Sequence, residues 1–162
     1  MSARKPIRSY DYVNHPFEKV KDQLKKDPLQ IFQKATTSAA KRGHDVAAEL
    51  HVNLAGIEIG KDITISIKEV KEGEKKPLSP PNLSILLEWS ASKNTLFFPV
   101  MEGRLTAYPL TGSETQLDFE GEYEVPLGVL GGVIDSVVGR GIAEASILQL
   151  IRDIAAHLRS TL

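Results

Sequence analysis

Residues 115–125 of this 162-residue chain read TQLDFEGEYEV and alternate between apolar and polar side chains. One face of the extended segment carries Leu117, Phe119, Tyr123 and Val125, while the other carries only acidic and amide side chains. Because successive side chains of a strand point to opposite faces, this pattern predicts a strand with one covered face. Such alternation is typical of an antiparallel sheet that meets a hydrophobic interior on one side and water on the other.

The C-terminal residues 142–162 supply an apolar surface that would cover that face. At the 100° per residue of an α-helix, one side carries Ala143, Ile147, Leu150, Ile151, Ile154, Leu158 and Leu162. This spacing predicts a long amphipathic helix. Roughly twenty residues at a rise of about 1.5 Å each give a length of about 30 Å, which is enough to cross a small sheet.

The rest of the chain predicts a strand, two short helices and a run of further strands. Residues 7–14 predict the first strand, and helices are expected to begin at Pro16 and Pro28, the second ending at Arg42-Gly43. The charged, proline-rich residues 71–82 predict a loop. Further strands are predicted at residues 46–54, 63–67, 83–89 and 97–110.

This order resembles the helix-grip fold of the START-domain and polyketide-cyclase/lipid-transport (SRPBCC) superfamily. The resemblance is strongest over residues 97–162, in FFPVMEGRLTAYPL, ETQLDFEGEYEVPLGVLGGVID and GRGIAEASILQLIRDIAAHL, and includes the Tyr-x-x-Pro-Leu-Gly run that starts at Tyr123. It implies an α+β fold in which a curved antiparallel sheet of six or seven strands wraps around a long C-terminal helix, with two short helices after the first strand. It also implies that residues 1–162 form a single START-like domain.

Composition narrows the class of protein. The hydrophobic fraction of 41% and the charged fraction of 25% are those of a globular chain. The sequence has no cysteine, which excludes disulfides, thiolate catalysis and zinc-thiolate or iron–sulfur sites. Because no metal-binding histidine spacing, phosphate loop, dinucleotide fingerprint or nucleophile elbow occurs, we expect no metal site and no cofactor.

Charge is unevenly distributed along the chain. Residues 1–42 carry ten Lys/Arg against four Asp/Glu, whereas residues 43–162 carry ten against seventeen. The basic lysines lack the interleaved aromatics of a nucleic-acid surface, so we interpret them as solvated helix faces and expect no nucleic-acid partner. No secretory signal and no stretch of about twenty apolar residues is found, so we expect a cytoplasmic protein without stable membrane insertion.

The resemblance implies a cavity between the sheet and the last helix. The lining candidates are the inward-facing side chains of the strands and of that helix, namely Trp89, Met101, Leu117, Phe119, Tyr123, Ile147, Ile151 and Ile154. Periodicity alone leaves an alternative open, in which these side chains meet and fill the core. Gly121 weakly favours the cavity, because a missing side chain leaves room or permits the sheet to curve.

Arg140 and Glu144 are the polar candidates, since both project onto the apolar stripe of the last helix. In one interpretation they mark the polar end of the cavity and orient a ligand, together with Tyr123 or Tyr108. In the other they form an i, i+4 ion pair at a solvated helix start.

Residues 126–139, PLGVLGGVIDSVVG, combine four glycines with apolar side chains. Three hypotheses fit this composition: a flexible lid that also caps the sheet, a buried capping helix, or a patch for dimerisation or membrane contact.

Three functions follow from this sequence. The first is binding or transport of a hydrophobic small molecule, such as a lipid, polyketide-like or aromatic compound, in the internal cavity. The second, which the resemblance also allows, is a cyclase/dehydratase-type enzyme acting on a bound polyketide, although no acid–base constellation is evident. The third is a non-catalytic homodimeric interaction module.

Overall fold

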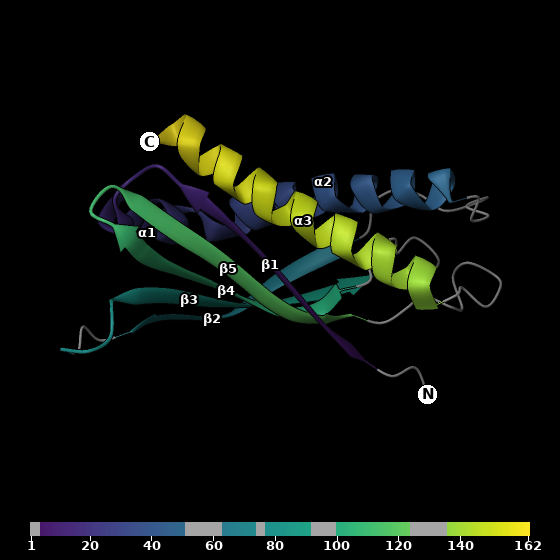
Figure 1. The fold of residues 1–162 in the computed structure, drawn as a ribbon, viewed down its shortest axis with the longest axis horizontal. Coiled ribbons are helices and arrows are strands. Elements are labelled where there is room, and N and C mark those ends of the chain that lie inside the picture. The colour runs from purple at the N-terminus through teal and green to yellow at the C-terminus, as the bar shows by residue number, and fades with distance from the viewer. Residues whose placement is uncertain (1–3, 51–62, 74–76, 92–99, 124–135) are drawn as a thin grey trace.

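The computed structural model describes residues 4–50, 63–73, 77–91, 100–123 and 136–162, which hold five strands and three helices. In chain order (Figure 1) these are β1 (Lys5–Val13), α1 (Phe17–Lys26), α2 (Pro28–Glu49), β2 (Ile63–Gly73), β3 (Asn82–Ala91), β4 (Val100–Thr111), β5 (Glu114–Tyr123) and α3 (Ser136–Thr161). The expected sequence of strand, two helices, further strands and a long final helix is therefore confirmed.

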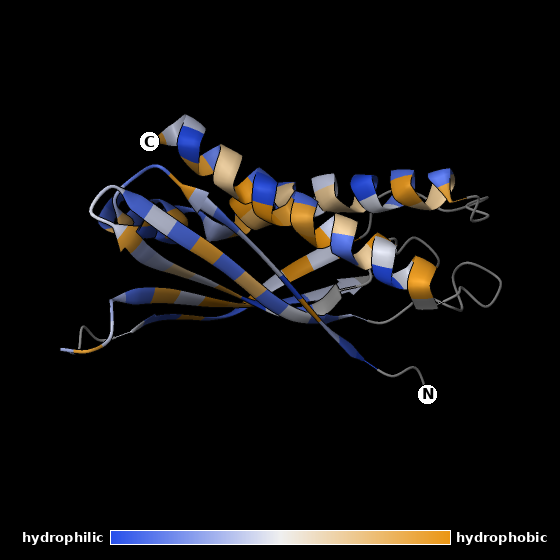
Figure 2. Ribbon diagram, viewed as in Figure 1, coloured by the Kyte–Doolittle hydropathy of each residue, from blue (hydrophilic) through white to orange (hydrophobic). Residues whose placement is uncertain are grey.

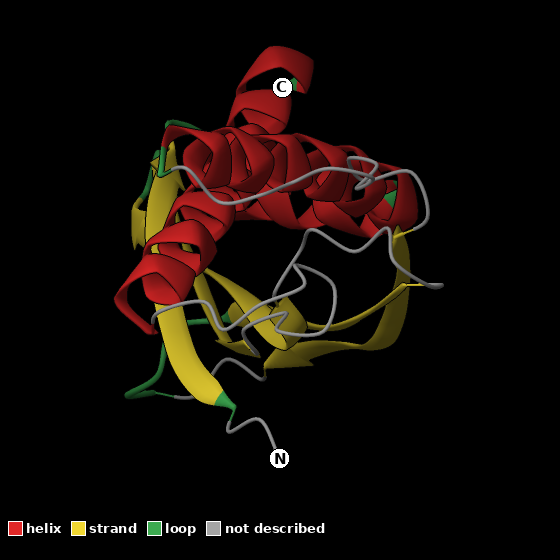
Figure 3. Cartoon of the chain, turned by 90° about the vertical axis from the view of Figure 1, so that its right-hand side faces the viewer, coloured by secondary structure: helices red, strands yellow, loops and turns green. Residues whose placement is uncertain are grey.

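The strands form one antiparallel sheet in the order β1-β5-β4-β3-β2. The N-terminal strand thus pairs with the last strand, and Ser9 lies opposite Phe119. The predicted alternation of β5 is confirmed, because Leu117 and Phe119 are buried while Glu120 is exposed. Hydrophobic and hydrophilic residues alternate along the ribbon of β5 (Figure 2). The sheet curves beneath the helices (Figure 3), so its buried face is concave.

The last helix covers this concave face, which confirms the α+β arrangement expected from the sequence. α3 packs along α2 and against β1 (Figures 1 and 3). Six of the seven side chains predicted from the helical period are fully or almost fully buried, namely Ala143, Ile147, Leu150, Ile151, Ile154 and Leu158, and the seventh, Leu162, is partly buried. Ile142, Ser146 and Ala155 are buried as well. The helix begins at Ser136 rather than Ile142.

The predicted strand at residues 46–54 is wrong in its first part, because Val46–Glu49 continue α2. The helix also does not end at Gly43, which is buried together with Ala39, Ala40 and Ala47. These small side chains recur at helical spacing where α2 packs along α3, and this burial outweighs the cost of about 1 kcal/mol for a glycine within a helix. Residues 51–54 lie outside the described residues. The described part of the chain therefore has five strands instead of six or seven.

The predicted loop at residues 71–82 is shorter than expected. Lys71–Gly73 belong to β2, where Lys71 pairs with Ser84 and Gly73 with Asn82 of β3. β2 can continue here although its own side chains are exposed, because it pairs with β3, whose Leu83 and Ile85 are buried, and the two strands satisfy each other's backbone hydrogen bonds.

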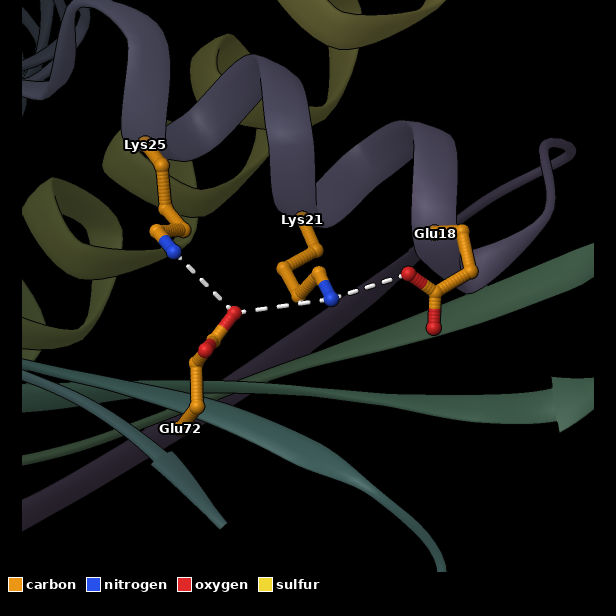
Figure 4. A network of polar contacts seen from close by, with 4 residues as sticks. All are labelled: Glu18, Lys21, Lys25 and Glu72. Atoms are coloured by element: carbon orange, nitrogen blue, oxygen red, sulfur yellow. Dashed lines mark hydrogen bonds and ion pairs between the residues drawn. The ribbon is translucent and has the colours of Figure 1, made fainter. Parts of the chain in front are cut away.

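A network of charged side chains ties this extension of β2 to α1 (Figure 4). Glu72 Oε1 lies 3.1 Å from Lys25 Nζ and 3.4 Å from Lys21 Nζ, and Lys21 Nζ lies 2.8 Å from Glu18 Oε2. The hydrogen bond from Lys25, with the charges of Lys25 and Lys21, lowers the pKa of Glu72 below its ordinary value of 4.5.

We expect Glu72→Gln to lower the unfolding free energy slightly at neutral pH and to have no effect in acid. A carboxylate whose pKa is lower in the folded state stabilises above its unfolded pKa, and that contribution is lost as pH falls through the folded value. Urea unfolding of the variant and the native protein at pH 7 and at pH 3 measures the difference. Glu69→Gln on the same strand is the control, and an equal loss from both variants would contradict the role of the network.

Candidate functional site

Seven of the predicted cavity-lining side chains come together between the sheet and α3. They extend from β3, β5 and α3, and each is at most 3% exposed, namely Trp89, Leu117, Phe119, Tyr123, Ile147, Ile151 and Ile154. All seven belong to the same hydrophobic core. The faces of the strands and of α3 that the sequence predicted to point inward therefore pack into one core.

Trp89 shows how closely this interior is packed. Its ring lies edge-on to Phe119 with centroids 6.0 Å apart and planes at 62°. Its indole Nε1 donates a hydrogen bond of 2.9 Å to Oγ1 of Thr36 on α2, and both residues are buried. Since protein atoms surround these side chains on nearly every side, the interior that the described residues form is filled, which is the alternative that periodicity left open.

Open hollows that predicted site residues line are found not beside Trp89 but in a groove between the edge strand β1 and α3. Two adjoining hollows of about 680 and about 400 Å³ make up the groove. Both are lined by Arg8 and Ser9 of β1 and by Leu148 of α3. We call these two hollows together the β1–α3 groove.

The smaller hollow brings together three residues predicted from the sequence. Tyr123, Arg140 and Glu144 line it, together with Pro6 and Ile7 of β1. Phe119 reaches the larger hollow. Segments from both ends of the chain therefore build the groove, because β1 pairs with β5 and α3 lies against β1.

Arg140 and Glu144 form an i, i+4 ion pair at the solvated start of α3, which is the second of the two interpretations of these residues. Arg140 Nε donates to Glu144 Oε1 at 2.8 Å, and the two side chains are 72% and 55% exposed. The hydrogen bond to Glu144 is the main cause of a raised pKa of Arg140, and Tyr123 makes a smaller electrostatic contribution. The pair is thus a charged, solvated rim beside Tyr123, and Arg140 remains protonated.

Two further candidates lie apart from this group. Tyr108 lies on the opposite face of the sheet, where its hydroxyl donates to Asp118 Oδ2 at 3.0 Å. Partial burial and this hydrogen bond raise the pKa of Tyr108. Met101 belongs to β4, and its side chain lies outside the described residues. Of the proposed lid, residues 126–135 also lie outside them, and Ser136–Gly139 form the first turn of α3.

Sequence reasoning missed Arg8, Asp11, Leu148 and Arg152, which line the larger hollow. On α3 a signal was present, because Arg140, Glu144, Leu148 and Arg152 follow one another at four-residue spacing, so that each lies beside the next on the helix surface. The residues of β1 carried no such signal, since their role depends on the neighbour that β1 acquires in the sheet.

In the part of the chain that the structure describes, no group of three or more His, Asp or Glu is placed to hold a metal ion. Within the same residues, no helix has the length and apolar content needed to span a bilayer.

No protein-family profile and no curated protein matches the sequence. Matching solved structures include a conserved protein from Geobacillus kaustophilus, with 15% identity, 97% of each chain covered and a TM-score of 0.47. They also include an aromatase/cyclase from a Streptomyces species, with 12% identity, 96% of this chain and 94% of that chain covered and a TM-score of 0.47. A START superfamily protein from Mycobacterium smegmatis matches with 14% identity, 97% and 99% coverage and a TM-score of 0.41. At these identities and TM-scores the likeness conveys no family, substrate or activity.

Proposed function

We propose that this protein binds a hydrophobic small molecule in the β1–α3 groove. The observation that carries the proposal is the smaller hollow, where the apolar side chains of Ile7 and Leu148 stand beside Tyr123 and the Arg140–Glu144 pair. Small-molecule sites are typically concave, about 300–1,000 Å³ in volume and mostly apolar, with a few polar groups that orient the ligand. The resemblance of the sequence to the START-domain superfamily favours the same function.

Among the described residues, the close packing around Trp89 makes the groove the favoured place of binding. A ligand next to Trp89 would have to displace closely packed side chains, whereas a ligand in the groove would cover surface that is already open. Each 100 Å² of apolar surface that it removes from water contributes about 2.5 kcal/mol. Binding deeper, between the sheet and α3, would require Phe119 or Tyr123 to move, because both separate the groove from the core.

A second candidate function is the cyclase/dehydratase-type reaction. One observation favours it, which is that Tyr123 and Arg140 line the same hollow. In such a reaction Arg140 would stabilise negative charge that develops on a carbonyl oxygen of the substrate. Turnover of a polyketide-like substrate that is lost in Arg140→Ala would support this function over binding alone.

Leu148→Glu tests the binding function. Leu148 lines both hollows and is 37% exposed, so a glutamate there should fold normally while placing a charge on the apolar wall of the groove. We expect at least a tenfold weaker affinity for the neutral fluorophore 1-aminoanthracene, measured by its fluorescence on titration.

The matched control is Leu110→Glu, because Leu110 is 49% exposed and lies at the far end of β4. This variant should bind the fluorophore as the native protein does. Equal affinities of both variants and the native protein would contradict binding in the groove. Size-exclusion chromatography of the same samples tests the homodimer hypothesis.

A further inference from the structure

The β1–α3 groove extends along α3 well beyond the hollow at Arg140. Because its two hollows share Arg8, Ser9 and Leu148, they join into one depression that runs from Arg140 to Arg152. Twelve residues of helix at about 1.5 Å each correspond to about 18 Å. The groove therefore suits an elongated molecule better than a compact one.

Arg152 differs from the other charged side chains of the larger hollow. Arg8 pairs with Glu120 at 2.7 Å, and Asp11 Oδ1 lies 3.4 Å from Arg159 Nη2 and accepts from the Tyr12 amide. Arg152, by contrast, is exposed and has no ion pair or hydrogen bond within the described ranges.

Asp118, the other acidic residue that lines the larger hollow, is also engaged. Asp118 accepts hydrogen bonds from the Tyr108 hydroxyl at its Oδ2 and from the Gln116 amide at its Oδ1. Both carboxylates of the larger hollow thus already accept hydrogen bonds, while the guanidinium of Arg152 has no partner in the described ranges. A ligand that binds beside Arg152 should therefore carry a hydrogen-bond acceptor rather than a further donor.

We propose that the ligand is a single-chain carboxylic acid that lies along the β1–α3 groove with its carboxylate on Arg152. Its chain would pass over Leu148 toward Ile7 and Tyr123 in the smaller hollow. An arginine guanidinium matches the geometry of a carboxylate and makes two charge-assisted hydrogen bonds to it. This inference rests on the proposed function and assigns to it a ligand class and a residue that recognises the ligand.

The test compares dodecanoate with dodecanol, which has the same chain length and lacks the charge. Displacement of 1-aminoanthracene measures the affinity of the native protein, Arg152→Gln and the control Arg42→Gln on α2. We expect the native protein and the control to bind dodecanoate about tenfold more tightly than dodecanol, as a charged hydrogen bond would provide. In Arg152→Gln this preference should vanish while the affinity for dodecanol stays unchanged. Rising salt should reduce the preference of the native protein.

The outcomes separate this inference from the proposed function. Equal affinity of the native protein for dodecanoate and dodecanol, or a preference that survives in Arg152→Gln, overturns the carboxylate inference alone. The same holds if the fluorophore binds and neither compound displaces it. If neither the fluorophore nor either compound binds to the native protein, the proposed function fails, and the inference fails with it.

Discussion

Replacing Trp89 with alanine should lower the free energy of unfolding by about 3–5 kcal/mol, the range typical of removing a large aromatic side chain from a core. Trp89 joins three elements, because it extends from β3, packs edge-on against Phe119 of β5 and hydrogen-bonds to Thr36 of α2. The alanine would leave a cavity where these elements meet. Urea unfolding followed by circular dichroism measures the loss, since the variant lacks the single tryptophan of the chain.

Trp89→Phe separates the ring from its hydrogen bond. Phenylalanine keeps an aromatic ring against Phe119 but cannot donate to Thr36 Oγ1, which is buried. We expect a smaller loss of about 1–3 kcal/mol, the cost of a buried polar group without its partner. Tyr10→Ala is the control, because Tyr10 is exposed and its removal should change stability by less than about 0.5 kcal/mol. A loss from Trp89→Ala no larger than that from Tyr10→Ala would contradict a filled core.

The second large effect is expected at Gly103, which lies opposite Gly121 in the pairing of β4 and β5. The ring of Phe119 lies over Gly103, so that a Cβ added there would overlap Phe119 Cζ. Phe119 is buried and has little room to move away. We expect Gly103→Ala to destabilise the protein by about 1–3 kcal/mol, as overpacking of a core does, and urea unfolding measures the change.

A double variant identifies the clash as the cause. Phe119→Leu shortens the side chain that the new methyl group meets, so Gly103→Ala should cost less in the Phe119→Leu background than in the native protein. Gly112→Ala is the control, because a Cβ at Gly112 has no neighbour within 4 Å. Additive losses in the double variant, or equal stability of the Gly103 and Gly112 variants, would contradict this explanation.

The elements predicted best are those whose burial follows a simple period. In β5, Leu117, Phe119 and Tyr123 are buried as their alternation indicated, and in α3 the apolar stripe is the buried stripe. The end of α2 was predicted wrongly because Val46, Ala48 and Leu50 alternate as in a strand, while Gly43 and Ala47 also fit a helical period. In such a short segment both periods match, and packing along α3 decides between them.

The candidate site was predicted only in part, for a related reason. Tyr123, Arg140 and Glu144 were recognisable from their positions beside a strand end and a helix start, and they do line one hollow. Arg8 and Arg152 were not, because a groove between an edge strand and a helix exists only once the order of the strands is known.

By itself, the sequence determined which faces of the strands and of the last helix are apolar, because burial of a face imposes a period that local residues display. It therefore determined the α+β class and the contact between a sheet and a C-terminal helix. Tertiary structure alone decided that the aromatic side chains of the described residues pack closely around Trp89 and that open space lies between β1 and α3. Whether side chains that face one another meet or leave room depends on the distance between elements far apart in the chain, and no pattern along one segment encodes that distance.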